Sequence, residues 1–167
     1  SPHMELVDGK KWEIEYYKGT RMEQKKITLA AEQLSIHQVV YIYGCEHTLV
    51  TIQGKVNTIQ VVNCKKVDVM FSDVIATVEA TNSQSIQMQV TGNLPCTFIE
   101  KCNDVMIFLS QAAMENTEVT TCASTGINVT TPPRTEGTDP VELSLPEQFI
   151  TRIEGRKLVT KHIEHKA

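Results

Sequence analysis

The chain has 167 residues, a formal charge of −4 and 41% hydrophobic residues, and only 5% of its residues are aromatic. This length supports one buried core with at most a small appendage. The negative charge argues against nucleic-acid or anionic-membrane binding, because both need a cationic surface. No apolar run approaches the roughly 20 residues of a membrane span, and no signal peptide opens the chain. We therefore expect a cytoplasmic protein with no membrane span.

The N-terminal residues precede any regular pattern. Residues 1–4 (SPHM) look like an expression scar, and we exclude them from the fold. Residues 5–26, with Trp12, Tyr16 and Tyr17, are expected to cap the open end of the core that follows, because an exposed terminal coil offers free strand edges. Ile27 and Leu29 then begin a shorter first coil.

The cysteines mark a repeat. Five cysteines, an odd number, do not suit a secreted disulfide framework, and none of their spacings is that of a metal site. Their spacing instead defines a column with intervals of 19, 19, 19 and 20 residues: Cys45, Cys64, Ser83, Cys102 and Cys122. We interpret the column as structural, because cysteine packs as a small apolar residue. No motif links His37 or His47 to a cysteine as a catalytic base.

Apolar residues repeat with the same period. Three places before the column are Ile42, Val61, Ala80, Ile99 and Val119. Five places after it are Val50, Val69, Met88, Ile107 and Ile127. Seven places after it are Ile52, Phe71, Val90, Leu109 and Val129. Because they alternate with polar residues, each unit contains two short strands with one face inward. Stacked units about 4.8 Å apart would share one continuous core. The period predicts an all-β fold, a parallel β-helix of about six coils over residues 27–133.

The residues before the cysteine column fit corners of such coils. Gly44, Asn63 and Asn82 are of the types that tolerate a left-handed backbone, whereas Lys101 and Thr121 depart from this pattern.

The C-terminal segment, residues 134–167, is predicted to be a loop followed by a β-hairpin. Prolines interrupt residues 130–140, and apolar positions resume in residues 149–153 and 158–163, on either side of a turn. A lone hairpin is marginal in water, so we expect it to exchange strands with a second copy in a homodimer.

Two stretches carry a family resemblance. VYIYGCEHTLVTIQGKVNTIQVVNCKKVDVMFSDV (residues 40–74) and PEQFITRIEGRKLVT (residues 146–160) closely resemble the C-terminal domain of the cyclase-associated proteins. The motifs YIYGC, GKVN, NCKKV, VTG and PEQF occur in order. The resemblance implies a right-handed parallel β-helix that dimerises through its C-terminal hairpin. It also implies a cytoskeleton-associated, non-catalytic protein without cofactors, which binds ADP-actin monomers and promotes exchange of their nucleotide for ATP.

The resemblance also suggests site residues. Actin binding would involve Lys55, Asn57, Asn63, Lys65 and Lys66, and dimerisation would involve Phe149, Ile153, Leu158, Val159 and Ile163. Because actin is acidic, we expect the lysines, at neighbouring corners of successive coils, to form one cationic strip. The alternative is that the lysines are solvated corner residues and the asparagines turn or ladder residues. The extreme C-terminus, here HIEHKA (residues 162–167), is implied to reach toward actin.

Two enzymatic readings are weaker. Polysaccharide lyases and hydrolases need carboxylates clustered on a groove, whereas Asp68, Asp73, Glu79 and Glu100 occupy unlike coil positions. A β-helix of the tubulin-cofactor-C type would stimulate GTP hydrolysis with an inserted arginine, or bind tubulin. Residues 38–133 contain no arginine, so GTPase activation ranks below actin binding.

Overall fold

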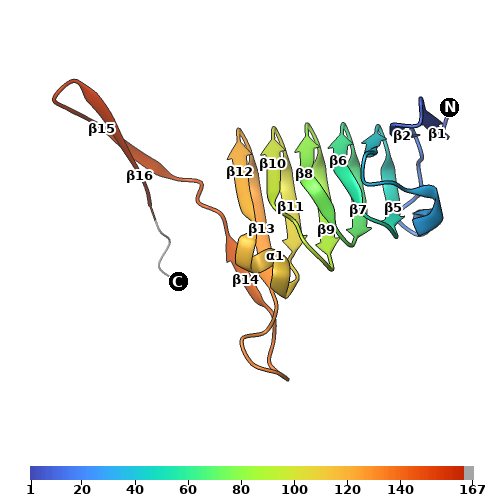
Figure 1. The fold of residues 1–167 in the computed structure, drawn as a ribbon. Coiled ribbons are helices and arrows are strands. Elements are labelled where there is room, and N and C mark those ends of the chain that lie inside the picture. Colours follow the sequence, from blue (N-terminus) through green and yellow to red (C-terminus); the bar gives the residue numbers. More distant parts are fainter. Residues whose placement is uncertain (164–167) are drawn as a thin grey trace.

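The computed structural model describes residues 1–163 and shows a stack of parallel coils with a hairpin projecting from one end (Figure 1). Two seven-stranded sheets form the stack. Sheet A contains, in spatial order, β1 (His3–Val7), β2 (Lys11–Glu15), β4 (Val39–Tyr43), β6 (Val56–Val62), β8 (Val74–Thr81), β10 (Cys96–Glu100) and β12 (Glu118–Cys122). Sheet B contains β3 (Lys25–Leu29), β5 (Glu46–Ile52), β7 (Lys65–Phe71), β9 (Gln84–Val90), β11 (Asn103–Phe108), β13 (Thr125–Thr131) and β14 (Val141–Ser144).

Each coil contributes one strand to each sheet, so β2 to β13 build six coils. The predicted parallel β-helix of about six coils is confirmed. A short 3-10 helix, η1 (Ala31–Gln33), and one helical turn, α1 (Gln111–Asn116), lie in connections between coils. In the described part of the chain, no helix has the length and hydrophobicity needed to cross a membrane.

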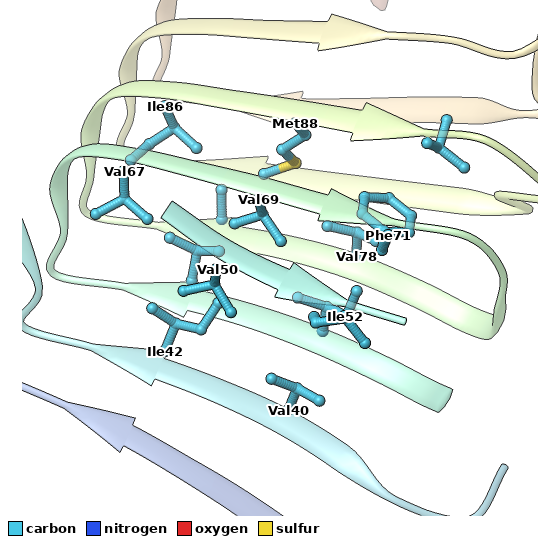
Figure 2. Close-up of a cluster of buried hydrophobic side chains, with 14 of the residues drawn as sticks. Val40, Ile42, Val50, Ile52, Val67, Val69, Phe71, Val78, Ile86 and Met88 are labelled. Carbon is cyan, nitrogen blue, oxygen red and sulfur yellow. The ribbon is translucent and has the colours of Figure 1, made fainter. Parts of the chain in front are cut away.

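The core consists of like residues stacked in register. Val50, Val69, Met88 and Ile107 are aligned on four neighbouring strands of sheet B, and each is at most 1% exposed. Figure 2 shows Val50, Val69 and Met88 of this column in one cluster with side chains of sheet A, such as Ile42 and Val78, in the interior. The predicted inward columns at residues 42–109 are therefore correct.

The last coil is longer than the repeat predicts. Parallel partners are mostly 19 residues apart in the series from β4 to β10 and from β5 to β11. They are 22 apart between β10 and β12 and between β11 and β13, because α1 is inserted in the connection. The predicted alignment of Val119, Ile127 and Val129 is thus wrong by two residues: Val119 lies opposite Thr97, Ile127 opposite Val105, and Val129 opposite Ile107.

The same shift removes Cys122 from the cysteine column. Cys122 lies opposite Glu100 and is exposed. Ser124 takes its place, since its Oγ accepts a hydrogen bond from the Cys102 backbone N–H (3.1 Å), as Ser83 Oγ does from that of Cys64 (3.1 Å). Thiols and hydroxyls together thus satisfy backbone groups along the column.

The coils begin earlier than predicted. β2 pairs in parallel with β4, and its Trp12 and Ile14 are buried, so residues 11–15 form part of the first coil rather than a separate cap. The boundary at residue 27 is therefore wrong. The true covering strand is β1, which pairs antiparallel with β2 from His3 to Val7. Excluding residues 3 and 4 from the fold was consequently also wrong.

One buried hydroxyl yields a stability prediction. Thr97 Oγ1 has no hydrogen-bond partner, and its side chain stacks between Val78 and Val119 in sheet A. Burying an unpaired hydroxyl is unfavourable, so Thr97→Val should raise the free energy of unfolding by about 1 kcal/mol in urea denaturation. Thr48→Val is the matched control, because the buried Thr48 hydroxyl donates to Glu46 O (2.8 Å). Thr48→Val should lower the free energy of unfolding, because it removes that hydrogen bond. Equal effects of the two substitutions would contradict the explanation that the Thr97 hydroxyl is unfavourable because it is unpaired.

Candidate protein-binding surface

In the second to sixth coils, the sheet A and sheet B strands meet at a tight corner, defined by residues 44–47, 63–66, 82–85, 101–104 and 123–126. Two positions at each corner have a left-handed backbone. The first column is Gly44, Asn63, Asn82, Lys101 and Ala123, with φ between 46° and 62°. The second column is His47, Lys66, Ser85, Asp104 and Gly126. Lys101 therefore belongs to the predicted corner column, and in the last coil Ala123 replaces Thr121.

Gly44 has a steric reason for being glycine. A Cβ atom at this position would lie 2.9 Å from the Tyr16 ring, which also packs edge-on against Tyr43. The first tight corner thus carries an aromatic cover that only glycine accommodates.

Asn63 forms part of an asparagine ladder. Asn82 Nδ2 donates to Asn63 Oδ1 (2.7 Å), and Asn63 Nδ2 donates to Tyr43 Oη (3.1 Å). These bonds hold the exposed amides in a fixed row along the tight corners. The structure thus confirms a ladder position for Asn63, while a partner contact at the same residue stays a prediction.

Lys65 and Lys101 line one shallow, open pocket over four tight corners, together with Asn63, Asn82, Gln84 and Asn103. Both lysines are exposed, and within the described residues neither forms an ion pair with a carboxylate. Unpaired ammonium groups beside fixed amides offer a partner both charge and hydrogen bonds.

Lys66 lies on the sheet B side of the same corners. It lines an adjoining pocket with Arg21 and His47, where Asp68 and Asp104 supply negative charge. This pocket contains both positive and negative side chains. The more strongly cationic part of the surface is therefore at Lys65 and Lys101. We call the surface formed by Asn63, Lys65, Lys66 and Lys101 the tight-corner surface.

The structure does not bring Lys55 to this surface. Lys55 and Asn57 lie at the other end of β6, at the opposite corner of the coil, and Asn57 Oδ1 accepts a hydrogen bond from Thr58 (2.9 Å). A seven-residue strand spans roughly 23 Å, so the five predicted actin-binding residues form two groups. The prediction of one cationic strip through Lys55, Lys65 and Lys66 is wrong.

Lys101 and Arg21 were missed as candidate residues. Lys101 follows Asn63 by two periods of 19, so the repeat itself placed it at the tight corner. Arg21 had no such signal, because the connection between β2 and β3 in the first coil does not share the repeat.

The hairpin residues form a separate surface. β15 (Phe149–Glu154) and β16 (Lys157–His162) pair with each other, and no pairing joins them to sheets A or B in the described residues. Phe149, Ile153 and Leu158 share one face of the hairpin. Ile153 and Leu158 are directly opposite each other and are 75% and 74% exposed.

The other predicted dimerisation residues do not share this face. Val159 lies on the other face and is half-buried, and Ile163 follows β16. Residues 164–167 of the predicted actin-reaching tail lie outside the described part of the chain.

Two of the buried cysteines, Cys64 and Cys102, are poor nucleophiles. The hydrogen bond with the Cys45 thiol, together with burial, raises the pKa of Cys64 far above its usual range, and burial raises the pKa of Cys102. Since the thiolate is the reactive form, both remain protonated and unreactive at neutral pH.

Alkylation should follow this pattern. At pH 8, iodoacetamide should label exposed Cys122 in the native protein and label Cys64 and Cys102 only after unfolding, as measured by peptide mass spectrometry. Labelling of Cys64 at the rate of Cys122 under native conditions would contradict the buried column.

Comparison with known proteins gives the family. The family model described as "Adenylate cyclase associated (CAP) C terminal" matches residues 1–165. The chain belongs to the CAP C-terminal domain family. It is 38% identical over 164 residues to the adenylyl cyclase-associated protein of Dictyostelium discoideum and 38% identical over 154 residues to adenylyl cyclase-associated protein 1 of Homo sapiens. These alignments cover 98% and 92% of the chain but 34% and 30% of the relatives, so the chain spans about a third of their length.

A solved CAP structure agrees with the fold. The cyclase-associated protein from Cryptosporidium parvum superposes with a TM-score of 0.88 at 30% sequence identity, covering 98% of this chain and 96% of that one. The resemblance of residues 40–74 and 146–160 to this family is thereby confirmed. The comparisons do not favour the tubulin-cofactor-C alternative.

Proposed function

We propose that this domain binds ADP-actin monomers through its tight-corner surface and promotes exchange of their nucleotide for ATP without catalysing a reaction itself. The observation that carries this proposal is the row of exposed lysines, Lys65 and Lys101, beside the Asn63–Asn82 ladder. Actin is acidic, and a fixed cationic surface both steers and orients an acidic partner. Membership of the CAP family supports the choice of actin, and we propose a cytoplasmic, cytoskeleton-associated location with it.

Acceleration of nucleotide release requires differential binding. A protein shifts actin toward an open, nucleotide-releasing conformation only if it binds that conformation more tightly than the closed one. A rigid β-solenoid suits this role, because its stacked coils hold Lys65 and Lys101 at a fixed separation two coils apart. The domain would thus select among actin conformations rather than adapt to each of them.

We also propose that the domain is a homodimer built by strand exchange through the hairpin. Ile153 and Leu158 form an exposed apolar pair on a two-stranded sheet, and such a sheet is marginal alone in water. A second hairpin would cover this face and the free strand edges together. Two tight-corner surfaces per dimer would then bind two actin monomers.

Titration of fluorescently labelled actin monomers tests the binding step. We expect saturable binding of one actin per chain, tighter for ADP-actin than for ATP-actin, and weaker at high salt because charge contributes. Absence of binding to either form at about 100 μM protein, well above the affinity of a functional contact, would overturn the proposal.

A further inference from the structure

The outer face of sheet A carries a strong excess of negative charge, and Figure 1 shows how the strands of this sheet are arranged along the stack. Side chains alternate along a strand, so the outward positions follow from the register of the buried ones. They include six glutamates: Glu5, Glu13, Glu15, Glu79, Glu100 and Glu118. Lys11 is the one lysine or arginine among the outward positions of these described strands, so the face has a formal charge of −5. The whole chain carries −4, which means that the negative charge is concentrated here.

Lys11 shows how this face holds a cation. Its Nζ lies 4.1 Å from the centroid of the Tyr41 ring and 3.6 Å from Glu13 Oε2. An aromatic face and a neighbouring carboxylate both attract an ammonium group, and together they orient it. In the first two coils, a tyrosine ring and a glutamate of this face thus bind a lysine of the same chain.

Phe98 repeats this arrangement further along the stack. It lies in the same outward column as Tyr41, three coils later, and is 44% exposed. Glu79 lies directly opposite it on β8, and Glu100 follows it by two residues on the same face. Glu118 is its diagonal neighbour on β12, since Phe98 pairs with Thr120.

These carboxylates have few partners within the protein. Glu79 Oε2 accepts hydrogen bonds from Gln60 Nε2 (3.3 Å) and Thr77 Oγ1 (3.2 Å), which fix its side chain against the sheet. Within residues 1–163, no lysine or arginine forms an ion pair with Glu79, Glu100 or Glu118. The aromatic ring and carboxylates around Phe98 are thus available to a cation from another molecule.

We propose that Phe98, Glu79, Glu100 and Glu118 form a docking site for a lysine or arginine side chain of a basic protein segment. The ring would bind the cation by cation–π attraction, and the three carboxylates would provide charge-assisted hydrogen bonds. The charge of this face repels nucleic acids and acidic proteins, so it serves a different partner from the tight-corner surface. An extended segment fits best, because Glu79, Glu100 and Glu118 lie on three neighbouring strands and therefore recur at strand spacing.

Fluorescence anisotropy with synthetic peptides tests this site. The probe is a dye-labelled 12-residue peptide of alternating lysine and serine, and the control peptide has glutamine in place of lysine. At about 50 mM salt, where charges are weakly screened, the lysine peptide should bind and the glutamine peptide should not. Glu79→Gln/Glu100→Gln/Glu118→Gln should weaken binding by about tenfold or more, and Phe98→Leu by about two- to fivefold.

A matched triple variant separates the site from general charge. Glu32→Gln/Glu136→Gln/Glu142→Gln removes the same charge from exposed positions elsewhere and should change affinity less than about twofold. Equal weakening by both triple variants, or no binding of the lysine peptide at about 1 mM, would overturn the proposal. Actin titration of the same variants provides an independent result. Unchanged actin affinity is expected, whereas a parallel loss would assign the Phe98 site to the actin contact and overturn a separate basic partner.

Discussion

Ile153→Asp/Leu158→Asp should halve the molar mass of the protein in solution, from that of a dimer to that of one 18.7 kDa chain. The two side chains lie opposite each other on the hairpin and are 75% and 74% exposed in the single chain. In a strand-exchanged dimer they would be covered, and burying two unpaired carboxylates would cost several kcal/mol. Light scattering after size exclusion measures the change directly.

The control for this variant must place aspartate at exposed apolar positions elsewhere. Met22→Asp/Ile36→Asp serves this purpose, because Met22 is 94% exposed and Ile36 is also exposed, both in connections of the first coil. It should leave the dimer mass intact. A wild-type mass of one chain, or a dimer mass in the hairpin variant, would show that the hairpin is not the interface.

The second large effect concerns the tight-corner surface. Lys65→Gln/Lys66→Gln/Lys101→Gln should raise the dissociation constant for ADP-actin by about tenfold or more, since each lost charge at an interface contributes up to about 1 kcal/mol. Glutamine keeps most of the side-chain length at Lys66 and Lys101, which have left-handed backbones. The change is measured by actin titration, and thermal unfolding verifies that the variant is folded.

The opposite corner supplies the comparison. Lys55→Gln/Asn57→Ala alters the two predicted residues that lie at the other end of β6. If actin binds the tight-corner surface, this variant should change the affinity for actin by less than about threefold, because one exposed charge contributes little to binding. The reverse ranking of the two variants would move the actin contact to the opposite corner.

The sequence was sufficient to predict the core because one coil resembles the next. Val50, Val69 and Met88 recur every 19 residues, and this period combined with apolar–polar alternation indicates stacked strands. The hairpin was also predictable, since apolar alternation resumes on both sides of Gly155. In each case the signal is the burial pattern of a strand, which repeats along the chain.

The errors arose where the period changes. α1 lengthens one connection by three residues. Its signals, the N-cap Ser110 and the helix-forming residues of QAAMEN, span too short a segment to reveal the new spacing. This shift exposed Cys122 and placed Ser124 in the column. At the N-terminus, Trp12 and Ile14 are separated from their partners Val40 and Ile42 by 28 residues, so the first coil did not appear in a 19-residue alignment.

The candidate site was predicted in part. Lys55 and Lys65 both occupy corners, and sequence alone does not show that each coil has two corners facing opposite directions. The strand between them separates their side chains, whereas two periods of 19 bring Lys101 to the corner column of Asn63. The acidic face of sheet A was missed because its glutamates occupy different columns and meet only when the strands are aligned.

Release of a fluorescent nucleotide from ADP-actin monomers tests the central claim most directly. Saturating protein should raise the release rate several-fold, because binding the open conformation more tightly shifts actin toward nucleotide loss. The Lys65→Gln/Lys66→Gln/Lys101→Gln variant should need about tenfold more protein for the same rate. A release rate that stays the same at saturating wild-type protein would contradict the account.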